Sequence, residues 1–107
     1  MKFDVFLTSD AEEDIFEIYS YVADIDSIQK ADNLFSNLKK ACLSLEVLPS
    51  RGHIPPELDR MNVRDYLEIH FKPYRILYQI RGTQVFVHCI LHGKRSLQDL
   101  LQKRLLR

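Results

Sequence analysis

The sequence predicts an α+β fold: an N-terminal strand, an αα-hairpin packed on an antiparallel sheet (β-α-α-β-β-β), and a C-terminal helical segment. Residues 63–95 alternate between apolar and polar side chains, which is the period of half-buried strands. Residues 10–48 carry apolar side chains at helical spacing instead. With 107 residues, of which 46% are hydrophobic and 28% charged, we expect one domain spanning residues 1–107.

The first strand and the first helix are predicted from the start of the chain. Residues 2–7 (KFDVFL) alternate like a short strand. Ser9, followed three residues later by Glu12, forms a capping-box pattern, and the acidic residues around it suit the positive end of a helix dipole. Apolar residues then recur at helical spacing. We therefore expect an amphipathic helix over residues 10–23.

A second helix follows a short break. Asp26 or Ser27 can provide its N-cap. The apolar stripe continues to Leu48, and Pro49 ends it because proline cannot continue a helix. We therefore expect a helix over residues 28–48. Two helices joined by a short connection form a hairpin, and such a hairpin usually covers one face of the sheet in an α+β domain.

A proline-rich loop and three strands make up the next part of the chain. Residues 49–62 contain three prolines and one glycine without any period. A connection of roughly 14 residues is long for a compact domain, and such loops are often functional. Reversals at Lys72–Pro73 and at residues 81–83 then divide the alternating region into three strands. Residues 85–91 are almost continuously apolar, as expected of a central strand.

The last segment, residues 95–107, is predicted to be a helical tail. Its leucines recur at helical spacing, and Ser96 can cap the helix together with Asp99. Two interpretations remain open from the sequence. The tail either docks on the core of this domain or presents an apolar surface to a partner.

The charges are distributed unevenly, although the net charge is zero. Residues 1–48 contain ten acidic and four basic residues, a net charge of −6, and residues 49–107 contain five acidic and eleven basic residues, a net charge of +6. Two solvated faces of opposite sign would explain this pattern. An anionic partner of the second half, such as nucleic acid or an acidic protein segment, would explain it too.

Several function classes are disfavoured by the sequence. No apolar run approaches the ~18 residues of a membrane span, and residues 1–20 do not resemble a secretory signal, so we expect a cytoplasmic protein without membrane contact. Cys42 and Cys89 lie within apolar patterns and are expected to be buried and reduced. His88 and His92 would lie roughly 13 Å apart on a strand. We therefore expect no metal site, and the absence of phosphate-binding loops predicts no cofactor.

Five short motifs occur in a particular order along the chain. They are Leu48-Pro49-Ser50-Arg51-Gly52, Pro56-Glu57-Leu58, Val63-Arg64, Tyr74-Arg75-Ile76-Leu77-Tyr78 and His92-Gly93-Lys94-Arg95. In this order and spacing they resemble the RelE/ParE superfamily of toxins from bacterial type II toxin–antitoxin systems, over residues 3–96. The resemblance implies a small cytoplasmic toxin, neutralised by a cognate antitoxin that folds over it, in a toxin–antitoxin hetero-oligomer.

One activity implied by the resemblance is ribosome-dependent mRNA cleavage, as in RelE-like toxins. Metal-free attack by a 2′-hydroxyl requires a base, cations that stabilise the phosphate, and an acid for the leaving oxygen. By resemblance, Arg75 and Arg95 occupy the positions of two catalytic arginines. Glu57 would then be the base, and His92 or His70 the acid, since imidazole titrates near neutrality.

The sequence departs from the nuclease pattern at two positions. RelE-like enzymes carry two lysines on the strand before the first arginine, and these positions are Tyr66 and Glu68 in this chain. Each remaining member of the set also has an ordinary structural interpretation. Glu57 can pair within the loop, Arg75 can be structural, and His92 can simply end a strand. The sequence thus leaves open whether the protein is an enzyme.

The other implied activity is that of ParE-like toxins, which poison DNA gyrase without known nuclease chemistry. The long helical hairpin, the missing lysine pair and the Gly-x-x-x-Pro-Glu-Leu loop place the sequence closer to this side of the superfamily. We therefore expect a ParE-like growth inhibitor first, a RelE-like nuclease second, and an inactive antitoxin-binding relative third. Contacts to the target or to nucleic acid would come from exposed bases, with Arg64, Lys72, Arg75, Lys94 and Arg95 as candidates.

Overall fold

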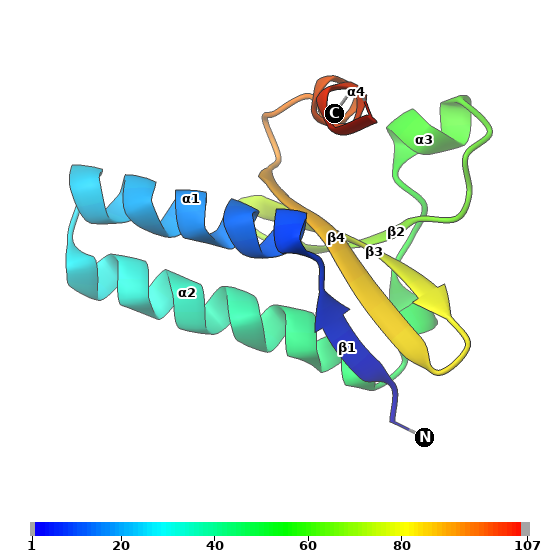
Figure 1. Ribbon diagram of the computed structural model, residues 1–107, viewed down its shortest axis with the longest axis horizontal. Helices are drawn as coiled ribbons and strands as arrows, with labels where there is room; N and C mark the ends of the chain where they lie inside the picture. Colours follow the sequence, from blue (N-terminus) through cyan, green and yellow to red (C-terminus); the bar gives the residue numbers. More distant parts are fainter. Residues whose placement is uncertain (1, 106–107) are drawn as a thin grey trace.

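The computed structural model describes residues 2–105, so the last two residues of the predicted tail lie outside the described residues. Four strands form one sheet in the order β1-β4-β3-β2 (Figure 1). They are β1 (Asp4–Leu7), β2 (Leu67–Phe71), β3 (Tyr74–Arg81) and β4 (Gln84–His92). The last three form the predicted antiparallel meander, and β1 joins β4 in parallel, so the sheet is mixed. The predicted α+β fold is confirmed.

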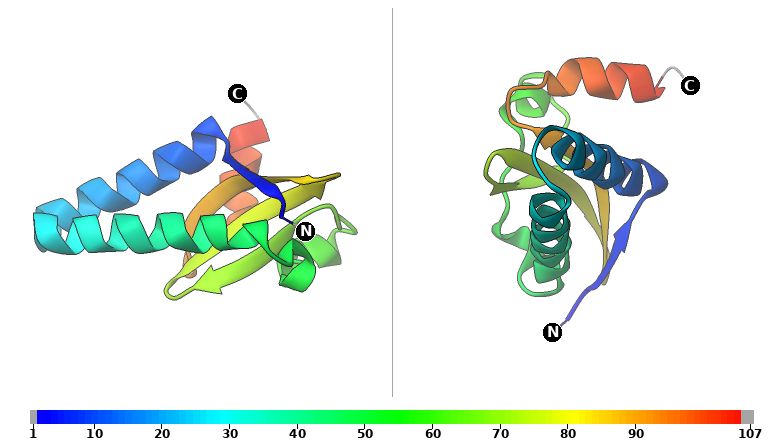
Figure 2. Two further views of the ribbon diagram at one scale, coloured as in Figure 1. Left: turned by 90° about the horizontal axis from the view of Figure 1, so that it is seen from below. Right: turned by 90° about the vertical axis from the view of Figure 1, so that its left-hand side faces the viewer.

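The helical hairpin consists of α1 (Ser9–Ile25) and α2 (Ile28–Leu43). The two helices run side by side and extend well beyond the sheet (Figures 1 and 2). The N-cap of α1 is Thr8, whose Oγ1 accepts the Ala11 N–H at 3.2 Å, and the predicted cap Ser9 already lies inside the helix. Ser27 caps α2, as predicted. None of the helices in residues 2–105 is long and apolar enough to cross a membrane.

The connection after α2 contains more structure than the sequence indicates. The helix ends five residues earlier than predicted, and two short 3₁₀ turns follow, η1 (Ser44–Glu46) and η2 (Pro49–Arg51). A short helix α3 (Pro56–Arg60) lies in the predicted loop. An isolated bridge joins this loop to β2: the His53 N–H donates to the Glu68 carbonyl at 3.1 Å, and the Glu68 N–H donates to the His53 carbonyl at 2.7 Å. The loop is therefore held against the outer edge of β2.

Gly52 allows this close approach of the loop to the sheet. A Cβ atom at this position would lie 2.8 Å from the Glu68 carbonyl oxygen and would also meet the hydroxyl of Tyr78. That hydroxyl donates a hydrogen bond to the Pro49 carbonyl. A side chain at position 52 would therefore push the loop away from β2 and separate the residues that it carries from the sheet.

The sheet is buried on both faces. On one face, residues such as Ile76 and Val87 pack against the hairpin around Ile15 and Leu38. On the other face, apolar residues of β3 and β4 pack against α3 and the helix α4 (Leu97–Leu105). The tail thus docks on the core of this domain, which is the first of the two predicted arrangements. Burial on both faces explains the continuous apolar run of β4.

Both cysteines lie inside this core. Cys42 packs with the hairpin and Cys89 with α4, and both thiols are free and fully buried, as predicted. Burial raises the pKa of Cys42 to about 11 and that of Cys89 to about 12. A thiol that stays protonated is a poor nucleophile, so neither cysteine has the character of a catalytic group.

Candidate functional site

Arg75 of β3 is the centre of a polar cluster on the sheet. Its Nη1 and Nη2 donate to the two carboxylate oxygens of Glu57 at 2.6 and 2.9 Å. Its Nε and Nη2 donate to the two oxygens of Glu68 at 2.7 and 3.1 Å. The side chain of Arg75 is 12% exposed and that of Glu68 only 1%. The guanidinium therefore lies between two carboxylates, one of which is fully buried.

Strand pairing explains why these residues meet. His70 lies directly opposite Arg75 in the antiparallel register, so their side chains share a face of the sheet. Glu68 lies two residues before His70 and therefore points to the same face. The helix α3 packs Leu58 into the core on this face and carries Glu57 in its first turn. Because side chains alternate along β2 and β3, Glu68, His70 and Arg75 lie on the face of the sheet next to the helix α3.

The electrostatics of the cluster stabilise its charged forms. Hydrogen bonds from Arg75 lower the pKa of Glu57 below its ordinary value of 4.5, and partial desolvation opposes this effect. Hydrogen bonds to Glu57, and then to Glu68, raise the pKa of the Arg75 guanidinium. A carboxylate held in this ionised form is a weaker base than an ordinary glutamate.

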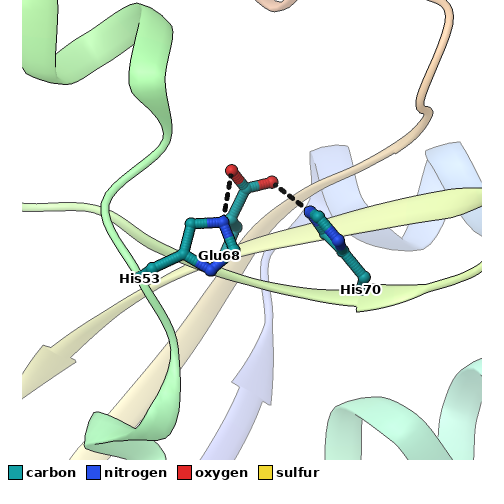
Figure 3. Close-up of side chains that lie close together, drawn as sticks. All are labelled: His53, Glu68 and His70. Carbon is teal, nitrogen blue, oxygen red and sulfur yellow. Dashed lines mark hydrogen bonds and ion pairs between the residues drawn. The ribbon is translucent and has the colours of Figure 1, made fainter.

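Two histidines flank the buried carboxylate (Figure 3). His53 of the loop places Nε2 3.2 Å from Glu68 Oε2, and His70 of β2 places Nε2 3.2 Å from Glu68 Oε1. The two rings are almost perpendicular, at 87°, and their centroids lie 5.2 Å apart. Each oxygen of Glu68 therefore has one nitrogen of Arg75 and one imidazole nitrogen as neighbours.

The cluster forms the wall of a groove of about 510 Å³. The groove lies between the loop, the helix α3 and the turn that joins β2 to β3. Its lining residues are His53, Pro56, Glu57, Arg60, Glu68, His70, Lys72, Pro73, Tyr74, Arg75 and Gly93. Arg60 and Lys72 are exposed in it, whereas Arg75 is engaged with the two carboxylates. The exposed positive charge of the groove is therefore that of Arg60 and Lys72 at its rim.

His92 and Arg95 line a different cavity. His92 pairs with Tyr74 across β3 and β4, and their rings meet edge to face at 5.7 Å. The Nδ1 atom of His92 accepts the Lys94 N–H at 3.1 Å. His92 and Arg95 border a cavity of about 410 Å³ beside α1, together with Asp14. The structure thus brings Glu57 and Arg75 together, and it places His92 and Arg95 apart from them.

Comparisons with known proteins identify the family. The family model of the ParE toxin of the type II toxin–antitoxin system, parDE, matches residues 5–97. The chain belongs to this family. A search of curated proteins found no match to this toxin.

Two solved structures share the fold of this toxin. The toxin is similar to a chain of the chromosomal ParDE system from P. aeruginosa, with a TM-score of 0.72 and 15% identity, covering 85% of this chain and 96% of that chain. It is also similar to a chain of the toxin–antitoxin complex RelBE2 from Mycobacterium tuberculosis, with a TM-score of 0.65 and 18% identity, covering 86% and 92%. The fold of the toxin is therefore that of the RelE/ParE superfamily.

The remaining candidate contact residues of the toxin lie outside the cluster. Arg64 is exposed and pairs with Asp59, its Nε lying 3.2 Å from Oδ1. Lys94 and Arg95 are exposed in the turn after β4. The exposed bases are thus spread along one end of the sheet and its flanking loop, and Arg75 differs from them because it is mostly buried and paired.

A second buried ion pair fixes the tail of the toxin. Asp14 of α1 is 5% exposed and accepts hydrogen bonds from Arg104 of α4 and from the Ile90 N–H, the latter at 2.9 Å. Arg104 Nη1 also donates to the His88 carbonyl at 3.2 Å. Burial raises the pKa of Asp14, although both of its partners oppose this effect. This pair joins α4 to α1 and to β4.

Sequence reasoning treated several of these residues singly. Asp14 is one of the acidic residues near the start of the predicted first helix, yet its position between Ala11 and Ile15 on the apolar stripe signals a buried acid. By sequence, Glu68 is only a departure from the nuclease pattern, and His53 is one of several candidates for chemistry or contact in the loop of residues 49–62. Their contact depends on the bridge between the loop and β2, which no spacing in the sequence indicates.

Proposed function

We propose that this ParE-family toxin inhibits growth by acting on DNA gyrase, without nuclease chemistry, and that a cognate antitoxin neutralises it. The observation that carries the proposal is the guanidinium of Arg75, which is bound by Glu57 and Glu68. An arginine that stabilises a cleaving phosphate must direct its N–H donors to that phosphate. Those of Arg75 are directed to carboxylates instead.

The charge of the cluster also argues against phosphate chemistry. Arg75 and its two carboxylates together carry a net charge of −1, so this paired part of the groove does not attract a phosphodiester, and the exposed bases Arg60 and Lys72 lie at the rim. Glu57, the base of the alternative mechanism, has a lowered pKa because Arg75 stabilises its ionised form. General bases work best with a pKa near the working pH, so this shift acts in the wrong direction.

The position of the other nuclease candidates supports the same conclusion. A base and an acid must both reach the reacting phosphate within hydrogen-bonding distance or through one water. Glu57 and His92 line different cavities, whereas His70, the other candidate acid, lines the same groove as Glu57 and contacts the Glu68 carboxylate. By resemblance, the lysine pair of RelE-like enzymes is replaced by Tyr66 and Glu68, so two of the cations of that mechanism are missing.

The proposal of an antitoxin partner rests on the neighbours and on an exposed apolar surface. Both similar structures are described as toxin–antitoxin systems or complexes. A groove of about 520 Å³ at the base of the hairpin is lined mainly by apolar residues, including Ile15, Phe16 and Phe35. Phe16 is 67% exposed. Contiguous exposed apolar surface marks a site of association, and an amphipathic antitoxin segment would cover it in a hetero-oligomer.

A paired assay on the purified toxin tests the proposed target. One arm measures supercoiling by DNA gyrase and trapped DNA breaks, and the other measures mRNA integrity in a translating ribosome extract. We expect inhibition of gyrase with intact mRNA, and reversal on addition of the antitoxin. Cleavage of mRNA with unaffected gyrase would establish the RelE-like alternative. Inactivity in both arms would overturn the gyrase target and favour an antitoxin-binding relative.

A further inference from the structure

We propose that His53, Glu68 and His70 form a binding site for one divalent transition-metal ion of the zinc type. The ligand atoms of the three side chains, two imidazole nitrogens and a carboxylate oxygen, all lie within 4.8 Å of one another. They come from two segments, the loop before α3 and the strand β2. Two imidazoles and one carboxylate are a donor set typical of zinc and related ions.

The distances fit a single ion. When nitrogen and oxygen ligands bind at about 2.0–2.2 Å in tetrahedral geometry, neighbouring ligand atoms lie about 3.3 Å apart. His53 Nε2 lies 3.2 Å from Glu68 Oε2 and His70 Nε2 lies 3.2 Å from Glu68 Oε1, so an ion held by both imidazoles would contact both carboxylate oxygens or draw one histidine toward the other's oxygen. The two imidazole nitrogens have to approach each other somewhat. Both side chains are about half exposed, at 56% and 49%, so they can do so by small rotations.

Glu68 is a preorganised ligand. Its carboxylate is 1% exposed, and Arg75 donates one hydrogen bond to each of its oxygens. A carboxylate has about four lone-pair sites, so the arginine leaves one on each oxygen, and each oxygen has one imidazole nitrogen at 3.2 Å. Arg75 therefore acts as the outer partner that orients a metal-bound carboxylate, and Glu57 in turn binds Arg75.

The local charge favours a cation. With neutral imidazoles, Arg75, Glu57 and Glu68 carry a net charge of −1 next to the histidines, although the whole groove, with Arg60 and Lys72 at its rim, carries +1. The exposed bases Arg60 and Lys72 extend into solvent at the rim of the groove. Because the half-exposed histidines form the open side of the site, positions not taken by the three side chains are accessible to water or to an exogenous ligand.

Binding would join the loop to the sheet. His53 belongs to the segment between η2 and α3, and His70 belongs to β2. An ion bound to both would add a link beside the existing backbone bridge between His53 and Glu68. It would therefore stabilise the loop that carries Glu57. Metal ligation requires neutral imidazoles, so acidification should release the ion.

The test is titration of the metal-free, full-length toxin with Zn²⁺ by calorimetry in a non-chelating buffer at neutral pH. We expect one ion per chain. The variants His53→Gln and His70→Gln should each weaken binding by more than about tenfold, the lower end of the loss seen for outer-shell partners. His92→Gln is the matched control, because His92 lies in the other cavity, and it should bind like the wild type.

Two further readouts make the outcome decisive. Zn²⁺ should raise the melting temperature of the wild type and of His92→Gln, but not of the double variant His53→Gln/His70→Gln. Co²⁺ should give the visible absorption of a site with nitrogen ligands. The proposal is overturned if the wild type does not bind Zn²⁺, or if the double variant retains the stoichiometry and affinity of the wild type. In either case the histidines only donate hydrogen bonds to Glu68.

Discussion

Glu68 determines the role of Arg75. A carboxylate that is 1% exposed needs a cation, and a buried ion pair that loses one partner costs about 3–5 kcal/mol. Arg75 supplies that cation and also binds Glu57. Arg75, which occupies a catalytic position by resemblance, is therefore held by ion pairs inside the domain. The same two residues, Arg75 and Glu57, would indicate a nuclease if their side chains faced the groove without pairing to each other.

The pair between Glu57 and Arg75 should give stability a defined pH dependence. Arg75 lowers the pKa of Glu57 in the folded protein, below its ordinary value of 4.5. The ionised carboxylate thus contributes stability above that ordinary value, and the contribution is lost as the pH falls through the folded pKa. We expect Glu57→Gln to be less stable than the wild type at neutral pH, with a difference that narrows below pH 4.5.

The measurement is the free energy of unfolding in urea, determined for both proteins from neutral pH down to about pH 3. Glutamine retains the size of glutamate and can still accept one hydrogen bond, but its NH2 group would face the second N–H donor of Arg75. The part of the difference that changes with pH therefore reports the charge of Glu57. A difference that stays constant over the whole range would mean that Glu57 stabilises the fold through packing and not through its ion pair.

At the level of single elements, the start of α1 gives a sharp prediction. Thr8 is in extended conformation and its side chain accepts the Ala11 N–H, whereas Ser9 is the first helical residue. Thr8→Ala should therefore cost about 1 kcal/mol of stability. Ser9→Ala, the matched control, should stay within about 0.5 kcal/mol. Urea unfolding of the two variants would distinguish them. If Ser9→Ala were more destabilising than Thr8→Ala, Ser9 and not Thr8 would be the cap.

Elements with a clear period could be predicted from the sequence, and those without one could not. The two long helices and the three-stranded meander follow from apolar spacing, and the tail helix begins where Ser96 caps it. The helix α3 was missed because its five residues are too few to show a period between prolines. The parallel pairing of β1 with β4 was missed as well, because it depends on how the hairpin crosses the sheet.

The candidate site was predictable only in part. Glu57 and Arg75 were both named, and the resemblance suggested that they belong to one site. The contact of Arg75 with Glu68 requires that both side chains lie on the face of the sheet that α3 covers. Strand alternation alone could have indicated that Glu68 and Arg75 share a face. The separation of His92 follows from the same alternation, since Tyr74 and Arg75 point to opposite faces.

For the whole molecule, the charge asymmetry of the sequence becomes a spatial one. The acidic first half forms the hairpin and its flanking strand, while most bases lie on the sheet, its loops and α4. Lys94 and Arg95 are exposed where β4 ends. An anionic surface of a large target would be attracted to this end of the sheet, and the hairpin would be repelled from it.

We therefore expect the double variant Lys94→Ala/Arg95→Ala to raise several-fold the toxin concentration that inhibits gyrase by half. Arg81→Ala is the control, because Arg81 is an exposed base at the opposite end of the sheet, beside the turn between β3 and β4. The readout is supercoiling, with growth of cells that express each variant as a second measure. Because the double variant removes two charges and Arg81→Ala removes one, equal losses per charge removed would show that net charge matters and that the location of the bases does not.

The bridge between His53 and Glu68 has a consequence for how the toxin can be bound. An outer strand with free N–H and C=O groups is a template for an extended segment of another chain. On β2 the toxin's own loop already occupies that template at its second residue, with hydrogen bonds in both directions. A partner that extends the sheet beyond β2 must first displace this loop. The bridge thereby hinders edge-to-edge pairing of two toxin chains at this part of β2.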